Sequence, residues 1–115
     1  MIQVEVYRKK GKICGFKVEG HADYAREGED IVCAAISALS LTGVFASEKL
    51  CNLSKQITQP EEGLLSLEMP TGLDEQQQQT YEIILETVII GIYETAKNYP
   101  DYINIEDEGG EYSWN

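Results

Sequence analysis

The chain opens with a regular alternation of apolar and polar residues, which is the period of a strand with one buried face. The apolar members of this first run are Ile2, Val4 and Val6. Residues 9–12, Lys-Lys-Gly-Lys, have the composition of a turn, with a glycine for the unusual backbone angle. A second alternating run covers residues 13–19, and its apolar set is Cys14, Phe16 and Val18. We therefore predict an antiparallel hairpin with the Cys14 side chain in the core.

The next apolar segment has the pattern of a helix. Asp30 is a favourable N-cap residue, and we predict a helix from there to about Leu50. Between Ile31 and Ala46, apolar residues occupy nearly every side of that helix, so most of its circumference should be buried. Either a second helix and the sheet enclose it, or a second subunit does.

The second half of the chain predicts the same kinds of element. Residues 56–59 and 64–69 flank a turn composition and predict a second hairpin. Asp74 is the expected N-cap of a second helix, which has apolar residues at helical spacing and ends near Asn98. Alternation over residues 102–106 predicts a short last strand.

The predicted order of elements is β-β-α-β-β-α-β. This order is typical of an α+β fold, and we expect a two-layer sandwich of about five strands with two long helices packed on one face. A chain of 115 residues has the length of one domain, so a single domain over residues 1–115 is expected.

Charge and cysteine content narrow the classes of partner and compartment. The formal net charge is −11, which argues against nucleic acid and anionic membranes, because both are bound chiefly through Lys and Arg. An acidic surface either favours encounter with basic ligands or serves solubility alone. Three cysteines without a C-x-x-C pair argue against a secreted disulfide framework and fit a reducing cytosol.

Targeting and membrane segments are not expected. The N-terminal residues lack the basic region of a signal peptide. Ser, Gly, Thr or Glu interrupts the apolar stretches within about 15 residues, which we expect to be too short for a membrane span.

The candidate chemistry lies around His21, the only histidine. It belongs to a non-periodic segment, residues 20–29, which starts with Gly20 and has Gly28 near its end, as a segment that bends over a site requires. Cys33 follows as the third residue of the predicted helix, where free N–H groups favour a thiolate and can hold an oxyanion. A thiol at a helix start within loop reach of an imidazole is the minimum equipment for a cysteine nucleophile and its base.

Each of these residues also has an interpretation without catalysis. In that interpretation Cys33 packs in the core and His21 meets solvent. Asp30 either holds the helix start or orients His21 and stabilises its charged form. The Ser37 hydroxyl lies one turn after Cys33, and it bonds within an active site or back to the Cys33 carbonyl. Cys51 lies near a helix C-terminus and is expected to be unreactive. The spacing fits no zinc template, so neither a metal nor another cofactor is expected.

One longer pattern joins these residues. It consists of Gly20-His21-Ala22, Tyr24, Gly28, Asp30-Ile31-Val32-Cys33-Ala34-Ala35 and Ser37. This pattern resembles the signature of the ribosomal-processing cysteine protease family (Prp). The resemblance implies that His21 is the general base and Cys33 the nucleophile, with Asp30 and Ser37 at the family's other polar positions in the active site. It also implies that residues 20–29 form a mobile substrate loop that carries Gly20, Tyr24 and Gly28.

The resemblance further implies an activity and a partner. Members of the family are similar in being homodimeric bacterial endopeptidases that remove the N-terminal extension of a large-subunit ribosomal protein. A cytoplasmic homodimer with a basic ribosomal protein as its substrate is therefore expected, without direct contact to nucleic acid or membrane. A function of another class stays open: a non-catalytic acidic adaptor or assembly factor that binds a basic ribosomal tail, with Cys33 as packing.

Overall fold

The computed structural model describes residues 1–20, 27–53 and 64–108 of the chain. Its elements in chain order are β1 (Ile2–Lys9), β2 (Lys12–Glu19), α1 (Glu27–Leu50), β3 (Leu64–Glu68), α2 (Glu75–Asn98) and β4 (Ile103–Asp107). The strands pair in the order β3-β2-β1-β4, and β4 is parallel to β1 while the other pairs are antiparallel. The described ranges hold four strands, where about five are expected for the chain; the remaining expected strand, at residues 56–59, lies outside the described residues.

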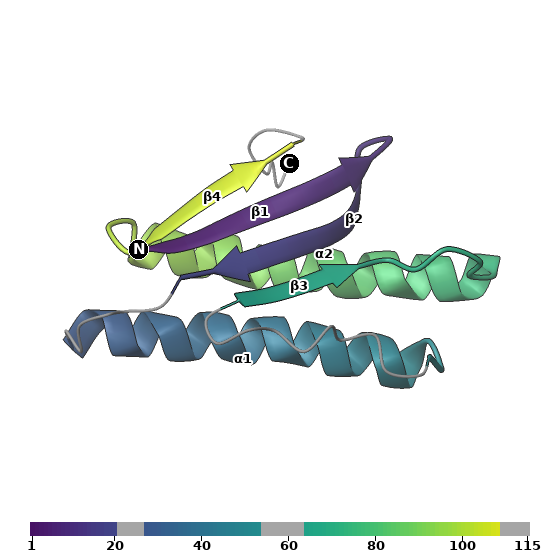
Figure 1. The fold of residues 1–115 in the computed structure, drawn as a ribbon, viewed down its shortest axis with the longest axis horizontal. Helices are drawn as coiled ribbons and strands as arrows, with labels where there is room; N and C mark the ends of the chain where they lie inside the picture. Colours follow the sequence, from purple (N-terminus) through teal and green to yellow (C-terminus); the bar gives the residue numbers. More distant parts are fainter. Residues whose placement is uncertain (21–26, 54–63, 109–115) are drawn as a thin grey trace.

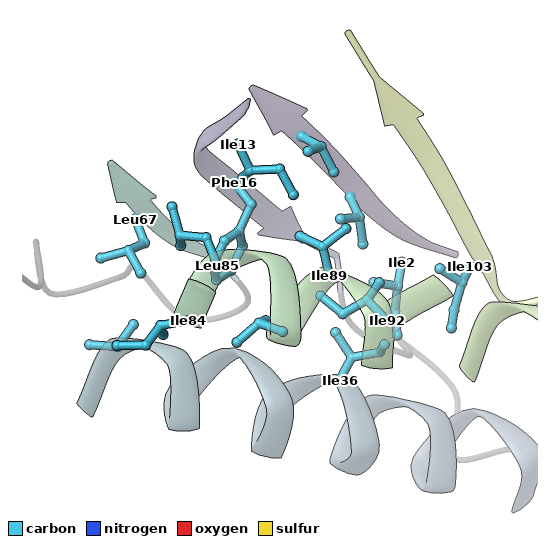
Figure 2. Close-up of a cluster of buried hydrophobic side chains, with 14 of the residues drawn as sticks. Ile2, Ile13, Phe16, Ile36, Leu67, Ile84, Leu85, Ile89, Ile92 and Ile103 are labelled. Atoms are coloured by element: carbon cyan, nitrogen blue, oxygen red, sulfur yellow. The ribbon is translucent and has the colours of Figure 1, made fainter. Parts of the chain in front are cut away.

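The helices lie on one side of this sheet. In Figure 1, α2 passes behind the strands and α1 runs beside α2 in the opposite direction. α2 contacts the sheet directly, and α1 packs mainly on α2. Figure 2 shows the resulting core, in which Ile36 of α1 and Ile89 of α2 belong to one cluster with Phe16 of the sheet. The predicted α+β class is confirmed.

The hairpin of β1 and β2 contains an irregularity that the alternating pattern did not predict. Tyr7 pairs with Gly15, but Arg8 pairs with Ile13, so Cys14 is an extra residue in a β-bulge. The bulge places Ile13 in the core with 1% of its surface exposed, while Cys14 is only half-buried and is not part of the core cluster. The prediction that Cys14 packs in the core is therefore wrong.

α2 begins as the sequence predicts. The Asp74 side chain accepts a hydrogen bond from the backbone N–H of Gln77, and the Gln77 side chain accepts one from the backbone N–H of Asp74. The Gln77 Nε2 atom also donates to the carbonyl of Cys51, the residue directly after α1, at 2.8 Å. This glutamine therefore joins the end of α1 to the start of α2.

A buried ion pair joins β1, β4 and α2. The Arg8 guanidinium donates to both carboxylate oxygens of Asp107, at 2.6 and 2.9 Å, and the Tyr93 hydroxyl of α2 donates to the same carboxylate at 3.0 Å. The Asp107 side chain is 2% exposed and the Arg8 side chain 13%. This network fixes the parallel pair of strands to the helix behind it.

α1 is buried on one side only. Val32, Ile36 and Val44 are in the core, whereas Leu41 and Phe45 are 38% and 49% exposed. The prediction that one protomer buries most of the helix is therefore not met, and the covering by a second subunit remains as the alternative.

The apolar character of α1 also affects the membrane expectation. Ile31–Leu50 has a mean hydropathy of 1.7 and is long and apolar enough to cross a membrane by length and composition. The expectation that every apolar stretch is too short is therefore wrong. A core helix of a soluble protein meets the same criterion, and a third of this segment is buried within the protomer.

Candidate active site

Cys33 lies where the core face of α1 meets its exposed face. It is half-buried and packs against the core cluster. Its neighbour Val32 has no exposed surface, while Ile31 is 55% exposed. A thiol in this position is held by packing on one side and is reachable from solvent on the other.

The first turn of the helix differs from the prediction. α1 begins at Glu27, so Asp30 is the fourth helical residue and not the N-cap, and Cys33 is the seventh. Acidic residues are favoured in a first turn, and Glu27 and Glu29 allow the helix to start earlier. An N–H group in the second turn is directed at the carbonyl four residues earlier, so the Cys33 N–H is not one of the free first-turn donors. The prediction that it contributes to an oxyanion site is wrong for this conformation.

The earlier start of α1 also weakens one source of stabilisation for a Cys33 thiolate. The partial positive charge of a helix is concentrated at its first turn and falls off beyond it. Cys33 lies in the second turn, so the helix start contributes less to its reactivity than predicted. Activation of the thiol then depends more on a neighbouring base.

Ser37 lies one turn after Cys33, and its side chain is exposed. Both predicted roles, a hydrogen bond in an active site and a bond back to a helix carbonyl, are compatible with this position. Thr42 on the same helix shows the second kind of bond, since its hydroxyl donates to the carbonyl of Ala38 at 2.6 Å.

Gly20 determines how the chain leaves β2. Its φ angle is +99°, and a Cβ atom at this position would lie 2.6 Å from the carbonyl oxygen of Met1. Only glycine fits this contact, which directs the segment that follows β2. Sequence reasoning missed this role of Met1, because its contact with Gly20 depends on the pairing of β1 with β2.

The four remaining predicted site residues fall into two groups. Gly28 and Asp30 lie on the first four residues of α1, where the structure describes the helix but not the side chains. His21 and Tyr24 lie outside the described residues. Figure 1 places the end of β2, the start of β1 and the start of α1 at the same end of the molecule. Gly20 and Glu27, the described residues on either side of the segment that carries His21, therefore lie at the end of the molecule that holds the first turns of α1.

The other cysteines provide a contrast. Cys51 is 2% exposed, and burial raises the pKa of its thiol, with a smaller contribution from the charge of Asp74. Its Sγ atom lies 3.6 Å from the carbonyl oxygen of Gln77. Burial and a raised pKa both reduce thiolate formation, which agrees with the expectation that Cys51 is unreactive.

Metal ligands do not gather in the part of the chain that the structure describes. Among the residues of 1–20, 27–53 and 64–108, no group of three or more His, Cys, Asp or Glu side chains is placed to hold a metal ion.

Comparison with known proteins finds a family whose model matches most of the chain. The model of the family described as "Cysteine protease Prp" matches residues 1–104. The ribosomal processing cysteine protease Prp of Bacillus subtilis is 29% identical over 107 residues, covering 91% of this chain and 96% of that protein. The protein of the same name in Mycoplasma pneumoniae is 33% identical over 93 residues, covering 77% and 82%.

A solved structure agrees with the fold. The essential ribosomal processing protease Prp from S. aureus, crystallised with a substrate peptide, matches with a TM-score of 0.76 and 25% sequence identity. The match covers 94% of this chain and all of that one. The arrangement of sheet and helices described above is thus that of a protease with a bound peptide.

Proposed function

The chain belongs to the cysteine protease Prp family, and from this membership we propose that it removes the N-terminal extension of a basic protein of the large ribosomal subunit. The observation that carries the proposal is the family match over residues 1–104, together with the half-exposed Cys33 beside the core. Its relatives are named as ribosomal processing cysteine proteases. The chain is thus a cysteine protease of that class, within the single domain expected from its length.

Cys33 is the proposed nucleophile and His21 the proposed base. The Sγ atom of Cys33 attacks the scissile carbonyl carbon while His21 takes the thiol proton. The C–N bond then breaks, and His21 gives that proton to the leaving amine. Water attacks the thioester, His21 accepts the proton of this water, and the C–S bond breaks to release the carboxylate product. The proton returns to the thiol, so the enzyme ends in its starting state.

The supporting residues position this chemistry. Gly20 directs the chain from β2 into the substrate loop, which carries Tyr24. The loop expected to reach residue 29 ends earlier, because α1 begins at Glu27 and Gly28 is its second residue. We propose that Tyr24 packs against the bound peptide and that Gly28 lets the first turn of α1 approach it closely. Asp30, inside the first turns of α1, stabilises the charged form of His21. The exposed Ser37 hydroxyl donates to the bound peptide beside Cys33.

A homodimer is part of the proposal. The exposed residues on the outer side of α1 are small or apolar and recur at helical spacing: Ile31, Ala34, Ala38, Leu41 and Phe45. No charged residue interrupts α1 between Ile31 and Ser47, in a chain with a net charge of −11. A second copy that offers the same stripe covers this face without burying a charge. The cytoplasm, where ribosomal proteins meet their processing enzymes, is the proposed location.

The experiment is digestion of the extended ribosomal protein of the same organism, followed by mass spectrometry. We expect the wild type and the control variant Cys14→Ala to yield two products whose masses add up to the substrate plus one water. Cys33→Ala is expected to yield none and to keep its circular dichroism spectrum, because replacing a half-buried thiol by a methyl group is a small change. Cleavage by Cys33→Ala at the wild-type rate would refute the nucleophile.

The same digestion separates the protease from an adaptor. An adaptor binds the basic ribosomal tail and leaves it intact, so wild type and Cys33→Ala would then give identical spectra. The acidic charge does not favour direct binding to RNA or to anionic membranes, and neither is proposed as a partner.

A further inference from the structure

The face of the sheet opposite α2 is open in the described protomer. Alternation along the strands places Gln3, Glu5 and Tyr7 of β1 on this face, while Ile2, Val4 and Val6 point into the core. It is the face turned to the viewer in Figure 1. No described helix covers it, so it is a broad surface without an assigned partner.

This open face is strongly acidic. By the same alternation, its charged residues within the described ranges are Glu5, Lys9, Lys17, Glu19, Glu68, Glu106 and Glu108. The Lys17 ammonium lies 3.5 Å from the carboxylate of Glu19, and Lys17 is the cross-strand neighbour of Glu5. Lys9 lies at the turn end of β1. Carboxylates therefore outnumber ammonium groups by five to two among these residues.

Two of these carboxylates lie side by side across a strand pair. Glu5 of β1 is the direct neighbour of Glu106 in parallel β4. Like charges on neighbouring strands destabilise a sheet, so this pair does not serve the stability of the fold. Glu5 and Glu106 also line a hollow of about 320 Å³ together with Val6, Asp107 and Glu108.

Tyr7 lies among the carboxylates at one end of the face. Its hydroxyl donates to Glu5 at 2.7 Å. This bond raises the pKa of Tyr7 to about 12, and the charges of Glu5, Glu68 and Glu108 add to the effect. Carboxylates from β1, β3 and the end of β4 therefore surround one aromatic ring, which is an arrangement suited to guanidinium and ammonium groups.

The open face also reaches the candidate active site. Glu19 directly precedes Gly20, where the substrate loop begins, and Tyr7 lies toward the other end of the same hairpin. A strand of eight residues such as β1 is about 26 Å long at about 3.3 Å per residue. An extended segment of similar length that leaves the active site can cross the whole face.

We propose that the open face of the sheet docks a lysine- and arginine-rich segment of the protein substrate, outside the peptide that is cut. This inference rests on the proposed function, because the occupant is the body of the ribosomal protein. A protein that binds ribosomal RNA carries excess Lys and Arg to contact phosphates. The acidic face complements that charge, steers the encounter and holds the substrate while its extension enters the site.

The test compares two triple variants that remove the same number of charges. The face variant carries Glu5→Gln, Glu68→Gln and Glu106→Gln. The control variant carries the substitutions Glu75→Gln, Glu94→Gln and Asp101→Asn, which lie on α2 and in the turn after it. Each variant removes three negative charges from a chain with a net charge of −11. A difference in kinetics between the two variants therefore depends on where the charges lie and not on the total charge. The glutamine at position 5 keeps a side-chain oxygen that accepts the hydrogen bond from the Tyr7 hydroxyl.

KM and kcat are measured for the extended ribosomal protein and for a short uncharged peptide that spans the cut bond. The face variant is expected to raise KM for the whole protein by about tenfold at low salt, as three weakened charge contacts would, with kcat unchanged. The difference in KM between the face variant and the wild type should shrink at high salt, because dissolved ions screen the charge contacts. The short peptide should be cut equally by all three proteins.

Two results overturn the docking surface: equal KM values for the face and control variants on the whole protein, or an equal rise for the short peptide. Failure of the proposed function is a separate result, since the wild type would then cut neither substrate. In that case fluorescence anisotropy with the ribosomal protein that lacks its extension still tests the face. The proposal requires salt-sensitive binding to the wild type that the face variant weakens and the control variant keeps.

Discussion

Val88 of α2 lies over Gly43 of α1 so closely that a Cβ atom on the glycine would come within 2.7 Å of the Val88 Cγ2 atom. The reverse contact occurs nearby, where a Cβ atom on Gly91 of α2 would lie 2.8 Å from the Cδ2 atom of Leu39 of α1. Each helix therefore receives a branched side chain of the other over a glycine. This packing fixes α1, which carries Cys33, against the helix that covers the sheet.

The two glycines are expected to respond differently to alanine. Val88 is buried and β-branched, so it cannot move away, and overpacking of this kind costs about 1–3 kcal/mol. Leu39 is half-buried and meets Gly91 with the end of a flexible side chain. Alanine also gains about 1 kcal/mol of helix propensity over glycine. We expect Gly43→Ala to lower the free energy of unfolding by about 1 kcal/mol, and Gly91→Ala to leave it nearly unchanged.

Urea denaturation measures both values. Val88→Ala in the Gly43→Ala background should cost less than it does in the wild type, because the overlap is then removed. A larger loss from Gly91→Ala than from Gly43→Ala would contradict this account of the helix contact.

The ion pair between Arg8 and Asp107 is expected to contribute strongly to stability. Asp107→Asn leaves the Arg8 guanidinium, which is 13% exposed, with the longer ion pair to Glu86 at 3.9 Å. Breaking a buried pair outright costs about 3–5 kcal/mol, so the remaining contact with Glu86 should keep the loss at the lower end of this range. The control is Glu94→Gln, which breaks an exposed pair with Lys97 and should cost less than about 0.5 kcal/mol. Thermal unfolding compares them, and similar melting temperatures for the two variants would show that the buried network is dispensable.

Glu86 predicts a pH dependence. Burial raises the pKa of its carboxyl group above the ordinary value of 4.5, even though the nearby Arg8 acts in the opposite direction. The folded state therefore disfavours the charged form. This cost is present above the folded-state pKa and absent below the ordinary value. Glu86→Gln should raise the melting temperature at pH 7, and the difference should vanish below about pH 4.5. A difference that stays constant between pH 7 and pH 3.5 would exclude this explanation.

The exposed stripe on α1 predicts the behaviour of a dimer variant. Phe45→Glu places a charge within the proposed interface and should convert a dimer into a monomer in sedimentation velocity. Ile83 of α2 is 67% exposed, more than the 49% of Phe45, and Ile83→Glu serves as the control. A wild type that sediments as a monomer at micromolar concentration would refute the homodimer, and dissociation by both variants would refute the choice of face.

Patterns with a regular period predicted most of the fold. Alternation in residues 2–7 and 102–106 predicted β1 and β4, and the N-cap signal of Asp74 predicted the start of α2. These elements were predictable because their local preferences agree with their tertiary contacts. The parallel pairing of β1 with β4 requires contacts between the two ends of the chain, and a single sequence gives no signal for it.

Two local features of the structure were not predicted from the sequence. The bulge at Cys14 inserts one residue in β2 and changes which of Ile13 and Cys14 reaches the core, although both are apolar. The first turn of α1 starts before Asp30, because a favourable N-cap residue marks a possible start and does not forbid an earlier one. The second error matters for the site, since it moves Cys33 from the first turn of the helix to the second. The family signature predicted His21 and Cys33, and their roles remain predictions.

The central claim is that Cys33 is a thiol made reactive by His21, and the rate of iodoacetamide labelling at each cysteine measures it most directly. Peptide mapping by mass spectrometry at neutral pH should find Cys33 labelled fastest in the wild type, with the half-buried Cys14 slower and the buried Cys51 slowest. His21→Ala should slow labelling of Cys33 by at least about tenfold and leave Cys14 and Cys51 unchanged. Equal labelling rates for Cys33 with and without the imidazole would contradict the claim.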